Sequence, residues 1–293
     1  MKEKYWIIEH EKLDPQTKNI ANEFLRCIKL SKKSPGTIDK YRRILQKFFT
    51  ECPKPLHQLV PDDVLNWLRT FYGDRKERTN SMALAVLSSF FKFCHAEEYI
   101  DRALIKNRWR PRLPKSLPKY LNSSELARVK LQAEKLSVRD RALVQFLLTS
   151  GCRRSEVSGL NVEDVDLDSR IARVVGKGNK VREVHFDEET ALLLKEYLYS
   201  HPDKKPLFLN KFGDRLMSKG IYAITTRLGK KAGLANNFSP HCCRHTFATN
   251  MMSRGADLEF IGNELGHRDL NTTRIYARIP SEELIASYRK IKE

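Results

Sequence analysis

Through the first hundred residues, apolar side chains recur every three or four positions, which places them on one face of a helix. Asp14-Pro15 and Ser34-Pro35 each combine a capping side chain with a proline in the first turn, and Pro61-Asp62 opens a third helix that Gly73 ends. A fourth helix is predicted over residues 79–98. Four helices of this kind can form a small bundle, so this part of the chain is predicted to be all-α.

The rest of the sequence mixes two periods. Residues 164–186 alternate like paired strands, and Gly176-Lys177-Gly178-Asn179 predicts a tight turn between them. Helical spacing is found over about residues 125–135, 138–150, 188–200, 218–232, 240–254, 258–265 and 270–279. The pattern predicts a mainly helical domain with one small antiparallel sheet, an α+β arrangement.

Between the two patterns, residues 108–119 combine three prolines with several basic residues. Proline fixes its own backbone angle and donates no backbone hydrogen bond, so this segment is predicted to be an extended linker. The expected organisation is an N-terminal domain over residues 1–107, a basic linker over 108–119 and a C-terminal domain over 120–293.

The net charge of the chain indicates which class of binding partner to expect. The 293 residues carry 54 Lys and Arg against 36 Asp and Glu, a net charge of +18, with 25 basic and 14 acidic residues in positions 1–119. Such an excess attracts polyanions, which favours nucleic acid over an anionic membrane surface. The candidate DNA contacts lie on the polar faces of the first domain, in the linker and on the predicted hairpin: Lys32, Lys33, Lys40, Arg43, Arg75, Arg78, Arg110, Arg112 and Lys180.

Other compositional features exclude several classes of protein. The longest run without a charged residue, 79–91, is shorter than the roughly 20 apolar residues of a membrane span, so no membrane segment is expected. The first ten residues lack the pattern of a signal peptide. The six cysteines show no CxxC spacing, which fits a reducing cytosol.

Two short motifs carry candidate chemistry on their own. Arg153 and Glu156 are three residues apart, so that on a helix the carboxylate can hold the guanidinium; a surface ion pair is the alternative. Lys177 lies between two glycines of the predicted turn, where it can reach a proton acceptor or a phosphate, although exposed turn lysines are common. The spacing is not that of a phosphate-binding Walker loop.

The densest motif is His241-Cys242-Cys243-Arg244-His245. His241, Arg244 and His245 can share one helix face while the two cysteines turn away. A zinc site and an anion site are the two interpretations, and the anion site is favoured because a permanently charged Arg244 would repel a dication. His267 and Tyr276 follow; the tyrosine is either a buried core residue or a nucleophile activated by nearby cations.

Together, Gly151–Glu156, Gly176–Lys180, Pro240–Thr249, Leu265-Gly266-His267 and Thr273–Tyr276 resemble, in order and spacing, the motifs of the tyrosine recombinase family of phage integrases and Xer-like enzymes. Thr37–Tyr41 and Leu113–Pro118 are similar to the family's SAM-like core-binding domain and its connector. The resemblance implies that residues 120–293 form the catalytic domain.

The resemblance also implies a role for each matched position. Tyr276 attacks the scissile phosphate to form a 3′-phosphotyrosyl link, and strand exchange passes through a Holliday junction. The other implied catalytic residues are Arg153 and Arg244 on the non-bridging oxygens, Lys177 as the acid for the 5′-oxygen, and His241 and His267 in the phosphate pocket, with Glu156 orienting Arg153. His245 is expected to act indirectly.

The resemblance further implies which partners to expect. No cofactor, metal ion or ATP is expected, since the phosphotyrosyl bond stores the energy for religation. The expected partners are a double-stranded DNA recombination site and further copies of the chain, as a tetramer on paired sites; a partner recombinase or accessory protein is left open. Cys152 and Cys243 stand where the family usually has leucine, which is expected to affect packing slightly.

The subtype is less defined by the sequence. A first helix beginning near Pro15 leaves no room for an arm-binding domain, which favours a two-domain Xer-like or transposon-resolvase type over the integrase of a mobile element. Residues 277–293 show helical spacing and either dock on a neighbouring protomer or cap their own domain. The alternative of a DNA-binding regulator without chemistry rests on the helix-turn-helix rhythm of residues 254–277.

Overall fold

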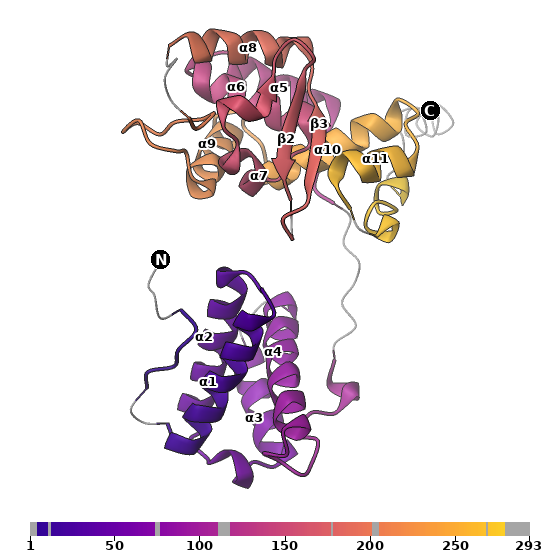
Figure 1. Cartoon of the computed structure of the whole chain (residues 1–293). Helices are drawn as coiled ribbons and strands as arrows, with labels where there is room; N and C mark the ends of the chain where they lie inside the picture. The colour runs from indigo at the N-terminus through magenta and orange to yellow at the C-terminus, as the bar shows by residue number, and fades with distance from the viewer. Residues whose placement is uncertain are drawn as a thin grey trace, which may run out of the picture. The chain divides into compact units, whose positions relative to one another are not determined.

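The computed structural model describes residues 5–10, 13–73, 77–110, 118–176, 178–200, 205–267 and 269–278. The chain divides into two compact units, Met1–Lys115 and Ser116–Glu293. Figure 1 shows the helices and strands of the two units. Each unit has its own hydrophobic core.

The first unit is a bundle of helices in its described residues. Asp14 and Ser34 cap the first two helices by accepting hydrogen bonds from the backbone amides of Thr17 and Thr37, as the sequence predicts. The helices are α1 (Pro15–Leu30), α2 (Pro35–Glu51), α3 (Pro61–Tyr72) and α4 (Glu77–Ala96), with short 3-10 helices at Leu56–Gln58 and Asn107–Trp109.

Aromatic side chains fill the core of this bundle. Phe48 makes edge-to-face contacts with Phe49, Trp67 and Phe91 at centroid distances between 4.9 and 5.9 Å. Trp109, within the predicted linker, packs against the same core. The first residues of the predicted linker therefore lie on the bundle.

The second unit is mainly helical and contains one small sheet. Its helices are α5 (Ser123–Ala133), α6 (Val138–Ser150), α7 (Arg154–Gly159), α8 (Glu188–Tyr199), α9 (Ser218–Lys231), α10 (Pro240–Ser253) and α11 (Leu258–Leu265). The strands are β1 (Val165–Asp166), β2 (Ile171–Val175) and β3 (Val181–His185), antiparallel in the order β1-β2-β3. These two units confirm the predicted fold class.

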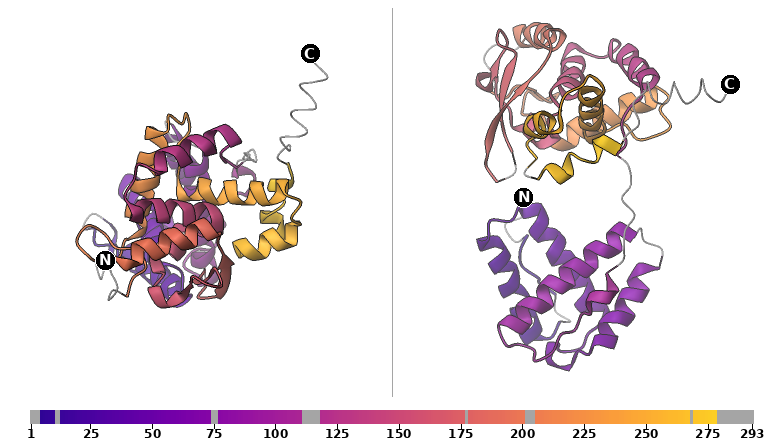
Figure 2. Two further views of the ribbon diagram at one scale, coloured as in Figure 1. Left: turned by 90° about the horizontal axis from the view of Figure 1, so that it is seen from above. Right: turned by 90° about the vertical axis from the view of Figure 1, so that its right-hand side faces the viewer.

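Helix α6 runs through the middle of this unit. It packs against α8 and α10, and every residue from Ala142 to Leu148 is buried. Figure 2 shows the sheet at one edge of the unit, with the helices grouped beside it. The inward face of the sheet contributes Ala172, Val174 and Val184 to the core.

One local prediction, the helix over residues 270–279, was wrong. The described part of this segment, residues 270–278, instead contains two 3-10 helices, Leu270–Thr272 and Tyr276–Arg278. Polar and β-branched residues at 271–273 disfavour an α-helix, and the Asp269 side chain accepts from the backbone amide of Asn271, two residues on, a turn arrangement. The described residues therefore lack the second helix on which the helix-turn-helix interpretation depended.

The short helix α7 was not predicted as a separate element. Six residues ending in a glycine give too little periodicity to identify. Within the described parts of both units, no helix is both long and apolar enough to cross a membrane.

Candidate active site

The site begins where α6 ends. Gly151 takes a left-handed conformation, with φ of 60°, and a Cβ at this position would lie 2.5 Å from Phe247 Cδ1. Its carbonyl accepts a hydrogen bond from Arg244 Nη1 at 2.9 Å. Gly151 therefore turns the chain sharply toward Arg153 and also fixes Arg244.

Arg153 is the N-cap of α7 and is held by Glu156. The Glu156 carboxylate accepts from the Arg153 backbone amide at 2.8 Å and from its Nη1 at 2.7 Å. Glu156 is only 2% exposed. Burial raises the pKa of this carboxyl, but hydrogen bonds from Arg182 and Arg153 outweigh burial and hold the pKa below its ordinary value. Glu156 is thus ionised at neutral pH.

Helix α10 presents His241, Arg244 and His245, while Cys242 and Cys243 point into the core. Arg244 is 2% exposed, and its Nη2 donates to the Leu265 carbonyl at 2.6 Å. Burial, together with the nearby Arg153, lowers the pKa of Arg244 to about 10. The guanidinium is still charged at neutral pH, and it has few negative charges near it.

Tyr276 is buried next to this helix. It is 2% exposed and packs with Phe247, Ile261 and Leu265. Its hydroxyl forms a hydrogen bond with His245 Nδ1 at 2.8 Å. Burial raises the pKa of Tyr276 to about 12, although Arg244 and Arg153 act in the opposite direction. His245, expected to act indirectly, thus contacts the tyrosine itself.

The three histidines share one electrostatic environment. The His241 and His245 rings meet edge to face at a centroid distance of 4.3 Å, and His267 Nδ1 is hydrogen-bonded to the Thr273 hydroxyl at 2.9 Å. Burial and the neighbouring positive groups lower all three pKa values, to about 4 for His245 and His267. At neutral pH the three imidazoles are uncharged.

Two cavities open on either side of Arg153. One, of about 410 Å³, is lined by Arg153, Arg154, Ser155, Tyr222, Ser239, Pro240, His241 and Arg244. The other, of about 490 Å³, is lined by residues that include Lys180, Arg182 and His267. Tyr276 lines neither of these cavities. The first has no carboxylate among these lining residues and suits an anion.

The structure thus brings Arg153, Glu156, His241, Arg244, His267 and Tyr276 into one region. Lys177 lies outside the described residues. Its neighbours form the expected turn, with Gly176 N donating to Lys180 O at 2.7 Å. Lys180, one of the candidate DNA contacts, is exposed on this hairpin.

The other candidate DNA contacts lie in the first unit. Those described are all exposed: Lys32, Lys33, Lys40, Arg43, Arg78 and Arg110. Arg43 pairs with Asp39 at 2.8 Å, and Arg110 donates to Ser88 Oγ at 3.1 Å. Arg75 and Arg112 lie outside the described residues. The roles of these cations stay predictions.

The zinc interpretation finds no cluster to support it in the described chain. No group of three or more His, Cys, Asp or Glu side chains among those residues could hold a metal ion. Cys242 and Cys243 are buried in the core, and burial raises both thiol pKa values, to about 11 for Cys242. Cys152 and Cys243, expected to pack slightly less well than leucine, are both 0% exposed.

Arg182 was missed by the sequence analysis. Its fork binds the Glu156 carboxylate, with Nη1 donating to Oε1 at 2.9 Å and Nη2 to Oε2 at 3.0 Å. A signal was present, because Arg182 shares the inward side of β3 with the buried Val184. A charged residue at such a position usually has a buried partner.

Comparisons with known proteins agree with this geometry. Residues 119–283 match the model of the phage integrase family, and residues 21–98 match that of the phage integrase N-terminal SAM-like domain. The chain is 35% identical over 288 residues to tyrosine recombinase XerC of Lactobacillus leichmannii, covering 92% of this chain and 98% of the relative. It is 33% identical over 280 residues to tyrosine recombinase XerA of Pyrococcus horikoshii, covering 94% of both chains.

Solved structures share the fold. A crystal structure of XerA recombinase matches with a TM-score of 0.54 and 28% identity, over 94% of this chain and 99% of the other. XerH site-specific recombinase, in a post-cleavage complex with a palindromic difH substrate, gives a TM-score of 0.75 at 23% identity, over 98% and 92% of the two chains. The chain belongs to the phage integrase family of tyrosine recombinases.

Proposed function

We propose that this protein is a site-specific DNA recombinase that cuts and rejoins double-stranded DNA through a covalent bond to Tyr276. The observation that carries the proposal is that Arg153, Arg244 and His241 line a cavity suited to an anion, while helix α10 holds Tyr276 through its hydrogen bond to His245. A phosphodiester supplies the negative charge that this cavity lacks.

In the proposed reaction, the Tyr276 oxygen attacks the scissile phosphorus while the bond to the 5′-oxygen breaks. The phosphoryl group gains negative charge in the transition state, and Arg153 and Arg244 are placed to bind its non-bridging oxygens. Lys177 gives a proton to the leaving 5′-oxygen. His241 and His267 add hydrogen-bond donors around the phosphate, since a neutral imidazole still carries one N–H.

The buried state of Tyr276 adds a step to this scheme. Its hydroxyl is bound to His245 and its side chain is 2% exposed, so a phosphate in duplex DNA cannot reach it in this arrangement. The 3-10 turn that carries Tyr276 must shift before cleavage. We therefore propose that binding of the DNA site precedes release of the tyrosine from His245.

The partner is double-stranded DNA, for which the net charge of +18 supplies electrostatic affinity. Recombination joins two sites, each cut on both strands, so the proposed assembly is a tetramer of this chain on paired sites. We place the protein in the cytoplasm on the nucleoid, where such sites lie. The names of its relatives favour a two-domain Xer-like enzyme over a mobile-element integrase.

The test is covalent capture on a nicked duplex. A binding site is first selected from fragments of the source genome, and a nick is then placed beside the cleavage point so that the released strand diffuses away. Wild type is expected to give a protein–DNA adduct that survives denaturation, whereas Tyr276→Phe gives none and binds the same duplex with equal affinity.

Two further variants refine the result, one within the proposed site and one control outside it. Arg244→Ala is expected to lose the adduct while its dissociation constant changes only a few fold, because many other phosphate contacts supply the affinity. Arg173→Gln removes an exposed charge from β2 and is expected to leave both measurements unchanged. Specific binding by wild type without any adduct would instead identify a regulator without chemistry.

A further inference from the structure

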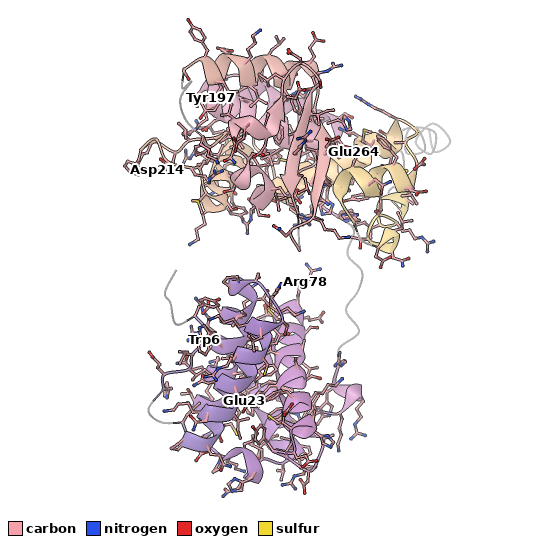
Figure 3. All side chains as sticks on the ribbon, in the orientation of Figure 1. Trp6, Glu23, Arg78, Tyr197, Asp214 and Glu264 are labelled. Atoms are coloured by element: carbon pink, nitrogen blue, oxygen red, sulfur yellow. The ribbon has the colours of Figure 1, made fainter. Side chains whose placement is uncertain are left out.

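Three arginines converge on the end of α11. Arg182 Nε donates to the carbonyl of Glu264 at 3.1 Å, Arg244 Nη2 to that of Leu265 at 2.6 Å, and Arg153 Nη2 to that of Gly266 at 3.4 Å. These consecutive carbonyls have no donor within their own helix and form the negative end of its dipole. Figure 3 labels Glu264 on α11, the helix that lies beside β3.

The charges of this cluster do not balance. Arg153, Arg182 and Arg244 carry three positive charges, and Glu156 is the carboxylate that pairs directly with two of them. The end of α11 offsets part of the remaining excess. Two of these arginines already have proposed phosphate-binding roles, whereas Arg182 has none.

The position of Arg182 is unlike that of the other two. Its side chain is 15% exposed, and all of its hydrogen bonds that the structure describes go to protein groups, namely both oxygens of Glu156 and the Glu264 carbonyl. A guanidinium that grips both carboxylate oxygens fixes the plane of the carboxylate. The same carboxylate holds the backbone and side chain of Arg153, so Arg153 cannot turn without breaking the pair.

Arg182 also connects two other parts of the site. It pairs with Val174 across the β2–β3 ladder, and the pair Val175–Val181 lies between it and the hairpin turn. Its Cδ and Nε lie so close to Gly266 that a Cβ there would be 3.0 Å from both atoms. The Arg182 side chain therefore links strand β3 to the Arg153–Glu156 pair and to the backbone next to His267.

We propose that Arg182 is a positioning residue for strand cleavage, which fixes Arg153 through Glu156 against the end of α11 and does not itself bind DNA. This proposal rests on the proposed recombinase function. Arg153 and Arg244 line the first cavity, whereas Arg182 lines only the second and has its described hydrogen bonds to Glu156 and the Glu264 carbonyl. Loss of Arg182 should therefore slow the chemical step rather than weaken binding.

The experiment uses the full chain and the nicked duplex described above. For Arg182→Gln, the single-turnover rate of adduct formation is expected to fall at least about 100-fold, while the dissociation constant changes less than about threefold. Arg182→Lys keeps the charge but not the fork, and is expected to react at an intermediate rate. Arg173→Gln, on the neighbouring strand and with a 72% exposed side chain, is the matched control and should react as wild type does.

A double-mutant cycle separates positioning from direct phosphate binding. If Arg182 acts through Arg153, then Arg153→Ala/Arg182→Gln will be no slower than Arg153→Ala alone. If the rate losses of the two single variants multiply in the double variant, Arg182 acts independently of Arg153, which overturns the proposal. A wild-type rate for Arg182→Gln, or a dissociation constant that weakens as much as the rate falls, would overturn it as well.

Thermal melting shows whether each variant is folded. If Arg182→Gln does not fold, Arg182→Lys takes its place in the same cycle, and unfolding of both variants would assign Arg182 a purely structural role and overturn the proposal. Failure of wild type to form an adduct overturns the recombinase function and this proposal together. An active wild type with unaffected Arg182 variants overturns the proposal alone.

Discussion

Replacing Gly151 with alanine should damage the second unit in a way that the structure allows to be estimated. The φ of 60° costs a non-glycine residue about 1–2 kcal/mol. The new methyl group would also lie 2.5 Å from Phe247 Cδ1 and 3.0 Å from Leu265 Cδ2, well inside normal contact. Forcing a methyl group into a packed core costs about 1–3 kcal/mol, and the stiffer unfolded chain returns about 0.4–1 kcal/mol.

The expected loss for Gly151→Ala is therefore about 1–4.5 kcal/mol in the free energy of unfolding, with a midpoint of about 3 kcal/mol. Gly213→Ala is the matched control, because Gly213 has φ of 80° but open space around a Cβ. It isolates the backbone cost, and we expect it to destabilise the unit by about 1 kcal/mol.

The assay is urea denaturation followed by two signals. All three tryptophans, Trp6, Trp67 and Trp109, lie in the first unit, so their fluorescence follows that unit while circular dichroism follows both. Gly151→Ala should shift only the unfolding transition of the second unit, which circular dichroism reports and tryptophan fluorescence does not. Equal losses for the two glycine variants would refute the close contact with Phe247, and a shifted fluorescence transition would refute a local effect.

Three further predictions concern pH, salt and the tyrosine. Since the folded-state pKa values of His245 and His267 lie near 4, below the ordinary 6.5, the unfolded chain binds more protons between these values. Calorimetry should show the second unit losing stability as the pH falls from 6.5 toward 4, and a constant melting temperature would contradict this. Lys33→Ala and Lys40→Ala, which remove exposed cations, should each reduce the slope of log affinity against log salt by about 0.9 in anisotropy titrations; unchanged slopes would exclude both from phosphate contacts. Tyr276→Phe removes the hydrogen bond to His245 and should cost about 0.5–1.5 kcal/mol in urea denaturation, whereas a gain in stability would mean that the bond is strained.

Much of the fold could be predicted from local pattern. Capped helices such as those after Asp14 and Ser34, and the turn around Gly178, have signals confined to a few neighbouring residues. The helix predicted over 270–279 failed because its apolar spacing continued while the residues at 271–273 favoured turns. The apolar spacing alone does not reveal that these residues favour a turn over a helix.

The residues of the candidate site could largely be predicted from the sequence, but the long-range contacts between them could not. Arg153 and Glu156 are close in sequence, so their pairing could be expected. Arg182 lies 26 residues from Glu156, and the bond between His245 and Tyr276 spans 31 residues. Both contacts depend on how β3, α10 and the last turns pack together, which a single sequence does not specify.

Cys152 and Cys243 adjoin the two arginines that are proposed to bind phosphate, and their surroundings determine how readily they are oxidised. A thiol next to guanidinium groups is ordinarily a reactive thiolate, because positive charge lowers its pKa. Burial reverses this effect, raising the pKa of Cys152 to about 12 and that of Cys243 well above its ordinary value. Neither thiol is ionised at neutral pH, and an oxidant in solution reaches the exposed Cys27 first. The two cysteines within the candidate site are therefore expected to resist oxidation under conditions that oxidise Cys27.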